Sequence, residues 1–505
     1  MARRTSRRGA WSVALVGLLV VGCGAGAAGT DAPPDAAPLP TGPLTLHGAG
    51  PTSVDDGVAE ACTGVTASGR QVLCVRAGGA GDGTASAPMG TIAEALAVIR
   101  DGDVVQVSGD EDAAAGTYAE SVKLGDYQDG CDNGGVAVNV SLRGGFRADF
   151  AARDAATYRT TVTGDGAAPA FVVCVMGGVT VIDGFVVSTG GRDRGIVASA
   201  GGFAGEGGTI VVSHDVVHDN QPPGTIDDAT FGGGVVVRAL DGATAEVRDC
   251  HVFDNVAGRG AGIVAQGGAS VAAGAVRVTR NRVERNTARG SHGGGMYVIG
   301  ASEISYNVVI DNQLLGELGG GGWGAGFIVD GNSARPPVSV HHDVVLGNQA
   351  ASYASGEFYD EDVDATVAFE LVSGNGCVDD RRSSGILVDV GGLGDSTARF
   401  ANLTVVAHHC PTAEVGALVV QGGATASVER SVFWDNLGVD DQPFDFGVDD
   451  AGSITVTDTV TQQGHAGAGN STDDPGLVDP ANGNFHAAAF PDRGAFAPGG
   501  LSPEP

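Results

Sequence analysis

The sequence predicts an all-β protein folded as a right-handed parallel β-helix, and three observations support this fold class. The chain holds 85 glycines in 505 residues with 42% hydrophobic residues, a composition typical of short strands joined by many turns. A nine-residue phrase returns seven times between residues 212 and 436. A third apolar strand precedes many of these phrases. The period of roughly 30 residues suits one coil of a three-sheet solenoid.

The first 22 residues predict an export leader of the lipoprotein type. Four arginines within the first eight residues precede an apolar run over 11–21, which is too short to span a bilayer. Small and apolar residues over 20–22 then precede Cys23. This pattern resembles a bacterial lipobox, in which the cysteine is lipidated and becomes the mature N-terminus. The alternative is an ordinary secretory signal in which Cys23 is incidental.

The next segment, 23–69, is expected to hold the lipidated Cys23 and a flexible tether, because 24–44 consists of small residues and prolines. We therefore expect an exported protein of the cell envelope, attached to the membrane by its lipid and lying at the outer membrane or the cell surface. The net charge of −32 argues against a nucleic-acid partner, which needs a basic surface.

Residues 70–110 are expected to cap the N-terminal end of the solenoid as strand, helix and strand. VLCVRAGG (72–79) is typical of a strand, and TIAEALAVI (91–99) is typical of a short amphipathic helix. Thr91 is the expected N-cap of this helix, with Glu94 completing a capping box.

The odd spacing of the apolar residues within the repeated phrase predicts the shape of the backbone. Each phrase ends in asparagine and carries apolar residues eight and three positions before it, as in VRDCHVFDN (247–255). Because Val247 and Val252 are five apart, one straight strand would place them on opposite sides. They can share one interior only if the chain bends between them. A small polar residue or cysteine lies five positions before the asparagine, and we expect it to make the bend in the left-handed conformation. The closing residues are Asn220, Asn255, Asn286, Asn312, Asn348, Asn375 and Asn436.

The third strand opens with small residues and completes each coil. It is expected in six coils, at 232–237, 260–264, 293–298, 324–329, 385–388 and 416–420. One phrase is replaced by NLTVVAHH (402–409), in which His408 or His409 takes the place of the asparagine. We expect roughly 12 coils, with the β-helix over 111–465 and a C-terminal cap and tail over 466–505.

Several segments resemble the pectin-lyase-like, right-handed β-helix proteins of bacterial envelopes. GDGTASAPMGTIAEALAVIRDGDVVQVSG (81–109), GTYAESVKL (116–124), SLRGGF (141–146) and TVIDGFVV (180–187) are similar to the opening of such proteins. DDPGLVDPANGNFHAAAF (473–490) is similar to the tail of their secreted members, although FPDRGAF follows in place of the usual Asp-Ala-Gly ending. The resemblance implies the fold and export. It does not imply one activity, since this fold hosts lyases, hydrolases, epimerases and adhesins.

Seven cysteines follow Cys23, and an oxidising compartment favours disulfides among them. A pairing of Cys62 with Cys74 is a local clip, one of Cys377 with Cys410 would join neighbouring coils, and one of Cys131 with Cys174 is a third candidate. Cys250 would then be unpaired. The sequence does not fix this connectivity.

Candidate glycan-binding residues come from an arginine-rich phrase and from outward aromatic positions. Five arginines lie within 277–289, and the register exposes Arg282 and stacks Arg280 between Asp249 and Tyr306. Such a patch could bind the carboxylates of an anionic glycan, or could be a surface ladder of arginines with neighbouring acids. We count Arg280, Arg282, Tyr306 and the outward Trp434 as candidates.

A calcium site is a weaker candidate. Asp360, Asp362 and Asp364 alternate in YDEDVD, and carboxylate oxygens are ligands that Ca²⁺ accepts. The alternative is a solvated acidic loop. No other cofactor is indicated.

The sequence assigns no catalytic residue. The only lysine, Lys123, is expected at the surface away from the regular coils, and the Arg-x-Lys element of polygalacturonases, which the resemblance would imply, is absent. We therefore expect a non-enzymatic protein that binds a glycan or another envelope component. The alternative is a polysaccharide lyase or glycoside hydrolase acting on a uronate polymer, which should show a groove where an arginine and two or three carboxylates converge.

Overall fold

The computed structural model describes residues 59–501 apart from 112–115, 126–136, 202–206, 241, 269, 271–273, 319–321, 332–334, 352, 378–384, 392–394, 411–415, 450 and 499. The chain divides into two units, Met1–Ala36 and Ala37–Pro505. The first unit, the expected leader, Cys23 and most of the tether lie outside the described residues. No helix among the described residues is long and apolar enough to cross a membrane.

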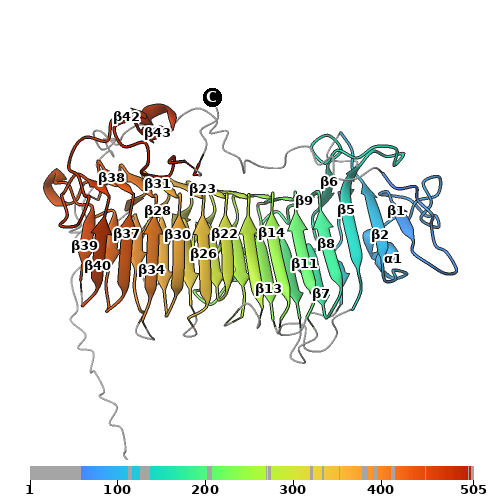
Figure 1. Ribbon diagram of the computed structural model, residues 1–505. Coiled ribbons are helices and arrows are strands. Elements are labelled where there is room, and N and C mark those ends of the chain that lie inside the picture. The colour runs from blue at the N-terminus through green and yellow to red at the C-terminus, as the bar shows by residue number, and fades with distance from the viewer. Residues whose placement is uncertain are drawn as a thin grey trace, which may run out of the picture. The chain divides into compact units, whose positions relative to one another are not determined.

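The second unit is a right-handed parallel β-helix, which confirms the predicted fold class (Figure 1). The chain runs through three long parallel sheets in turn, and each coil stacks its strands on those of the coil before it. Right-handed crossovers are the rule for parallel strands. The long sheets contain 13, 12 and 11 strands in the described residues, in agreement with the expected number of coils.

The 13-stranded sheet lies across the front of Figure 1 and pairs its strands in exact chain order. Its strands are β1 (Val72–Val75), β2 (Asp103–Ser108), β5 (Val140–Phe146), β8 (Val179–Asp183), β11 (Thr209–Ser213), β14 (Thr244–Arg248), β18 (Ala275–Thr279), β22 (Ser302–Ser305), β26 (Pro337–His341), β30 (Asp364–Ala368), β34 (Thr397–Ala401), β37 (Thr425–Glu429) and β40 (Ser453–Thr457).

The 12-stranded sheet follows each of these strands after one corner. Its strands are β3 (Thr117–Tyr118), β6 (Thr160–Val162), β9 (Phe185–Val187), β12 (Val216–His218), β15 (His251–Phe253), β19 (Arg282–Glu284), β23 (Val308–Ile310), β27 (Val344–Leu346), β31 (Leu371–Ser373), β35 (Thr404–Val406), β38 (Val432–Trp434) and β41 (Val460–Thr461).

The 11-stranded sheet closes each coil. Its strands are β4 (Val122–Leu124), β7 (Phe171–Val175), β10 (Ile196–Ala200), β13 (Val235–Ala239), β17 (Ile263–Gln266), β21 (Met296–Ile299), β25 (Phe327–Asp330), β29 (Glu357–Asp360), β33 (Ile386–Val388), β36 (Leu418–Val420) and β39 (Phe446–Val448). The strands β4, β7, β10, β29 and β39 were not among the six expected third strands.

A short fourth parallel sheet lies at the corner after the 12-stranded sheet, which the sequence did not predict. It contains two-residue strands, β16 (Val256–Ala257), β20 (Thr287–Ala288), β24 (Gln313–Leu314), β28 (Gln349–Ala350) and β32 (Gly376–Cys377). A buried stack of small residues and one leucine lies beneath it: Ala257, Ala261, Ala288, Leu314, Ala325 and Ala350.

The corner inside each phrase differs from the expectation in one respect. The left-handed residue lies six positions before the asparagine, as at His214, Asp249, Arg280, Tyr306, His342, Phe369 and Arg430, where φ ranges from 47° to 63°. The small polar residue one position later points into the interior. Asn281 shows why: its buried side chain donates to the carbonyl oxygen of Val247 at 2.9 Å and to Asn307 Oδ1 at 3.0 Å. The role of this polar residue is therefore to form hydrogen bonds between coils, and the bend itself is made by the residue before it.

The closing asparagines form a second buried ladder. Asn286 Nδ2 donates to Asn312 Oδ1 and to the carbonyl oxygen of Val252, both at 3.0 Å, while Asn286 Oδ1 accepts the amide of Asn255 at 3.1 Å. His408 occupies one rung of this ladder, since its amide donates to Asn436 Oδ1 at 3.2 Å. Each rung satisfies backbone groups that a corner would otherwise bury unpaired.

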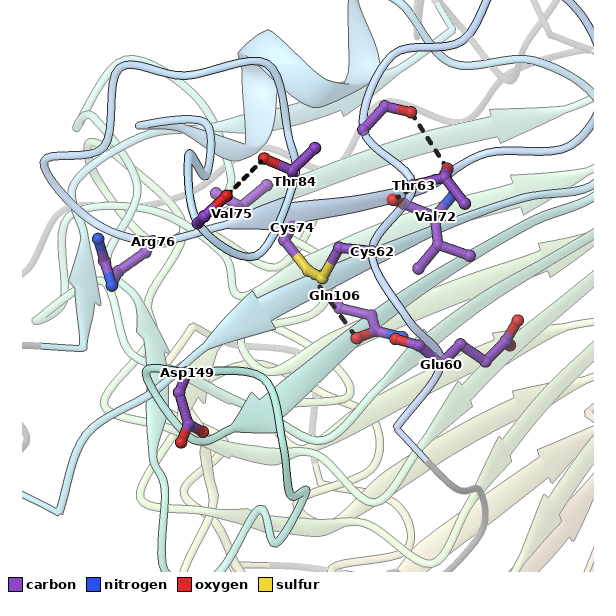
Figure 2. Close-up of a disulfide and its surroundings, with 12 residues drawn as sticks. Glu60, Cys62, Thr63, Val72, Cys74, Val75, Arg76, Thr84, Gln106 and Asp149 are labelled. Carbon is purple, nitrogen blue, oxygen red and sulfur yellow. Dashed lines mark hydrogen bonds between the residues drawn. A yellow bond between two sulfur atoms is a disulfide. The ribbon is translucent and has the colours of Figure 1, made fainter.

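The N-terminal end is capped by α1 (Ile92–Leu96) and a disulfide. The capping box of Thr91 and Glu94 is present, and Ile92 lies in the main core. Figure 2 shows the disulfide between Cys62 and Cys74, which ties the segment before β1 to β1 itself.

The C-terminal segment folds back onto the outer face of the 12-stranded sheet. It contains the 3-10 helix η3 (Pro480–Asn482) between two antiparallel strands, β42 (Leu477–Asp479) and β43 (Asn484–Ala487); the 3-10 helix η2 (Val439–Asp441) precedes it. Phe485, Ala495 and Phe496 pack on this face, over Val308, Val344, Leu346, Leu371 and Val406. In Figure 1 this segment lies at the end of the solenoid beside β38.

Candidate functional site

The outer face of the 11-stranded sheet carries two columns of side chains, because alternate residues of a strand point outward. The first column follows the strand register from β4 to β36: Lys123, Val172, Val197, Val236, Val264, Tyr297, Ile328, Phe358, Leu387 and Val419. The second column lies two residues further along each strand. It includes Arg238 on β13, Asp330 on β25 and Asp360 on β29.

A cation-lined hollow lies at the N-terminal end of this face. Its volume is about 420 Å³. Three basic side chains (Lys123, Arg194 and Arg238) surround it, with Phe231 and the outward valines Val172, Val197 and Val236. No acidic residue is among the described residues that line the hollow. We call it the cationic hollow.

The stacking of coils brings these basic residues together from distant parts of the chain. Lys123 is exposed on β4 between the buried Val122 and Leu124, so it belongs to the regular coils, contrary to the sequence expectation. Arg194 Nε donates to the carbonyl oxygen of Phe231 at 2.8 Å, which fixes the guanidinium beside the next coil.

An aromatic belt runs from the cationic hollow along the same face. It consists of Phe231, Tyr297, His292, Trp323 and Tyr353, with ring centroids of successive neighbours 4.9–6.0 Å apart. Burial, with the nearby charge of Arg259, lowers the pKa of His292 to about 4, so its ring is neutral at pH 7. Trp323 and Tyr353 are half-buried and offer ring edges and faces to a ligand.

A carboxyl cluster follows the belt, formed by Asp330, Asp360, Glu361 and Asp389. Asp330 and Asp360 are register partners on adjacent strands, and Tyr297 donates its hydroxyl proton to Asp330 Oδ2 at 2.8 Å. Burial, and then the charges of Asp389, Glu361 and Asp330, raise the pKa of Asp360 to about 8. Asp360 is thus a protonated carboxyl group at pH 7 that lies beside other acids, an arrangement suited to general acid chemistry.

The arginines predicted from the sequence lie elsewhere, at the corner and on the 12-stranded sheet, and their charges are paired. Arg280 forms a bidentate pair with Asp249 at 2.7 and 2.8 Å, and Arg282 pairs with the buried Glu284 at 2.5 Å. The other arginines of the group pair with Glu303, Asp254 and Glu317. The patch is therefore an ion-pair ladder, the second of the two interpretations that the sequence allowed.

The two predicted aromatic candidates have different surroundings. Tyr306 is 37% exposed at its corner, where its ring stacks on His342 with centroids 4.7 Å apart. Trp434 points outward as expected but packs into the cluster under the C-terminal segment. It is therefore not a free sugar-stacking platform.

The predicted Ca²⁺ site does not form. The chain turns sharply at Glu361 and Asp362, whose φ angles are 54° and 70°, so Asp360 and Asp364 end on different sheets. Asp364 pairs with Arg399 at 2.6 Å. Among the residues that the structure describes, no group of three or more His, Cys, Asp or Glu side chains could hold a metal ion.

The cysteines are placed as follows. Cys62 and Cys74 are joined, and Cys174 and Cys410 are both disulfide-bonded. Cys131 and the side chain of Cys377 lie outside the described residues. Cys250 is a buried free thiol.

The fold and this face define the class of the molecule: a parallel β-helix whose outer sheet carries a cationic hollow, an aromatic belt and a carboxyl cluster. No protein-family model matches the chain, and no curated protein matches it. Among solved structures it is similar to the crystal structure of pectate lyase Pel9A, at 11% sequence identity over 83% of this chain and 86% of that chain, with a TM-score of 0.38. A likeness of this extent supports no inference about activity.

Proposed function

We propose that this protein binds an anionic polysaccharide, such as a uronate polymer, along the outer face of its 11-stranded sheet. The observation that supports this proposal most is the cationic hollow. In a chain of net charge −32, Lys123, Arg194 and Arg238 line one hollow that contains no acid among its described lining residues. A carboxylate is the group that such donors hold best, because the hydrogen bonds are charge-assisted.

The aromatic belt extends this site. A polymer anchored by one carboxylate in the hollow would pass over Phe231 and then, two coils beyond the next one, over Trp323, because the belt of rings continues between them on the same face. Strands of neighbouring coils are about 4.8 Å apart, so the belt matches an extended chain that runs along the solenoid axis.

The test is the affinity of the purified protein for polygalacturonate and alginate, with dextran as the uncharged control polymer. Lys123→Gln removes an exposed charge without removing a core contact. Since a charge-assisted bond contributes about 1.5–3 kcal/mol, we expect the variant to bind at least about tenfold more weakly. Arg280→Gln is the matched control, because it removes a cation that is paired with Asp249 away from the hollow. Equal loss in both variants, or no loss in Lys123→Gln, would contradict the proposal.

A second candidate function is hydrolysis of the bound polymer, and the carboxyl cluster favours it. Asp360, protonated at pH 7, could donate a proton to a leaving glycosidic oxygen, and Asp330 or Asp389 could serve as base or nucleophile. Release of reducing ends by the wild type and loss of at least about a hundredfold in Asp360→Asn would support hydrolysis. Asp364→Asn is the control, since Asp364 lies on another sheet. A wild type that binds polymer and releases neither reducing ends nor unsaturated uronates is a binding protein only.

We also propose that Cys23 carries a lipid that holds the protein at the cell envelope. The lipobox-like sequence before Cys23 supports this proposal. Mass spectrometry of the mature N-terminus tests it: a diacylated Cys23 is expected, and an unmodified or differently cleaved N-terminus would contradict it.

A further inference from the structure

A second hollow lies on another face of the solenoid, over the first coils of the 12-stranded sheet. Its volume is about 630 Å³, and it opens over β6, β9, β12 and β15. The C-terminal segment does not occupy it, because that segment packs from β23 onward. Three histidines (His214, His218 and His251) line it together with Arg159 and Phe253. We call it the histidine hollow.

The strand register explains its composition. Outward residues of adjacent strands form one column of Thr161, Val186, Val216 and His251, and His218 and Phe253 are neighbours in a second column. The floor is therefore apolar, while hydroxyl and imidazole groups surround it. The ring of His218 stacks on that of Phe253 with centroids 4.9 Å apart, and the ring of His251 lies 4.4 Å from the same phenyl centroid.

Each imidazole is held by a carboxylate through one ring nitrogen. His214 Nδ1 lies 2.8 Å from Asp183 Oδ1, His218 Nδ1 lies 2.8 Å from Asp219 Oδ2, and His251 Nε2 lies 3.1 Å from Glu284 Oε1. Burial raises the pKa of Asp183, but the bond from His214 and the charge of Arg153 outweigh it and lower the value to about 2. Burial likewise raises the pKa of Glu284. The hydrogen bond from His251 and the charges and hydrogen bonds of Arg282 and Arg285 outweigh this effect and lower the pKa to about 2.

Because an ionised carboxylate can only accept, the bonded nitrogen of each ring must be the donor. In the neutral imidazole the other nitrogen is then an acceptor: Nε2 of His214 and His218, and Nδ1 of His251. His214 Nε2 is 3.8 Å from Asp249 Oδ2, which is beyond hydrogen-bond distance. Among the described residues, neither His218 Nε2 nor His251 Nδ1 has a hydrogen-bond partner.

The geometry points to a binding site for a neutral sugar residue. Three oriented acceptors lie beside the donors of Arg159 and the hydroxyl groups of Thr161, Thr163 and Ser188, over an apolar floor. A sugar hydroxyl both donates and accepts, so vicinal hydroxyls can bond to an imidazole nitrogen and to a donor at once, while the C–H face of the ring covers the valines. This site does not depend on the cationic hollow, which lies on a different sheet.

The charges around the three imidazoles are balanced, which favours a neutral ligand over an anion. The carboxylates are Asp183, Asp219, Glu246, Asp249, Asp254 and Glu284, and the guanidinium groups are those of Arg153, Arg159, Arg248, Arg280, Arg282 and Arg285. Apart from Arg159, the guanidinium groups named here are each paired with one of these carboxylates.

The test uses the purified protein and side-chain nitrogen NMR of its histidines. Without ligand, we expect the Nδ1–H tautomer at His214 and His218 and the Nε2–H tautomer at His251. Galactose, glucose, xylose, N-acetylglucosamine and their β-linked tetramers are then titrated. We expect at least one to shift these three rings with a Kd of about 1 mM or tighter.

Two variants and two controls complete the test. His218→Ala and Thr161→Val, both at half-exposed positions, should each weaken sugar binding at least about fivefold. His465→Ala, just after β41 at the other end of the solenoid, and Lys123→Gln, in the cationic hollow, should not change it. The opposite tautomers, no shift with any neutral sugar, or binding of galacturonate in place of neutral sugars would overturn the proposal. If the proposed function of the cationic hollow is wrong, the result will be different: Lys123→Gln will leave polygalacturonate binding unchanged.

Discussion

Val247 and Val252 are both fully buried in the same core, although they are five residues apart and belong to β14 and β15 of different sheets. Asp249, with φ of 55°, turns the chain between them. The same relationship recurs coil after coil, so the dry interior is lined from both sheets by residues that a straight strand would have separated.

Truncation of either valine should therefore destabilise the protein by a similar amount. Val247→Ala and Val252→Ala each remove two buried methyl groups and leave a cavity, at a cost of about 2 kcal/mol. Glu246→Ala, at the outward position beside Val247, should change the free energy of unfolding by less than about 0.5 kcal/mol. Urea denaturation followed by circular dichroism measures all three. A stable Val252→Ala would contradict the shared interior.

Substitution of an asparagine in the ladder should destabilise the protein by more than the small volume of the asparagine side chain suggests. Asn286→Ala leaves the buried amide of Asn255 and the carbonyl oxygen of Val252 without their partner, at a cost of about 3 kcal/mol. Gln313→Ala, exposed on the next coil, is the control and should be neutral. Hydrogen exchange should show the loss of protection at Asn255; unchanged protection would show that the ladder does not stabilise the corner.

The core also contains carboxyl groups, which should make the protein less stable at alkaline pH. Asp343, Glu357 and Glu370 are fully buried, and Tyr359 donates its hydroxyl proton to Glu357 at 2.8 Å. Burial raises the pKa of all three, that of Glu357 to about 8 from the ordinary 4.5. Between these values the folded state holds a proton that the unfolded chain releases, so stability falls as the pH rises from 4.5 to about 8.

Glu357→Gln keeps the shape of the side chain and removes the titration. We expect its melting temperature to exceed that of the wild type by at least about 3 °C at pH 9 and to match it near pH 4. Asp364→Asn, at the surface, should leave the pH dependence unchanged. A wild type whose melting temperature rises between pH 5 and pH 8 would show that these groups are ionised in the folded state.

The C-terminal segment should detach when its apolar anchor is removed. Phe496→Ala takes a buried ring from the cluster over the 12-stranded sheet, and we expect proteases to cleave the segment at least about tenfold faster while the coils stay intact. Trp434→Ala should act in the same way and leave polygalacturonate affinity unchanged. Val478→Ala, at an exposed position, is the control. Loss of glycan binding in Trp434→Ala would instead restore that residue as a binding platform.

The coils could be predicted from the sequence because their cause is local. The five-residue spacing of the valines, the closing asparagine and the capping box each lie within nine residues. Each of them indicates a particular local structure. The position of the left-handed residue could not be predicted, because residues such as Arg280, Tyr306 and Phe369 occupy it, and these residue types do not favour the left-handed conformation. The buried polar residue beside it was more conspicuous and was assigned the wrong role.

The candidate site depends on contacts that the sequence does not contain. Lys123 and Arg238 are far apart along the chain and line one hollow only because β4, β7, β10 and β13 stack in register. The alternation of inward and outward residues along the third strands would have predicted that both side chains point outward. It would not have predicted which coil each residue occupies. The arginines of 277–289 were visible as a group, whereas all of their carboxylate partners except Glu284 lie on neighbouring coils.

The most direct measurement of the proposed function is a crystal structure of the protein with a short galacturonate oligomer. We expect one carboxylate of the oligomer between Lys123 and Arg238 over the outward valines, and the following sugar rings along Phe231 toward Trp323. An oligomer bound only at the arginines of the ion-pair ladder, or an empty cationic hollow at saturating ligand, would contradict the proposed function.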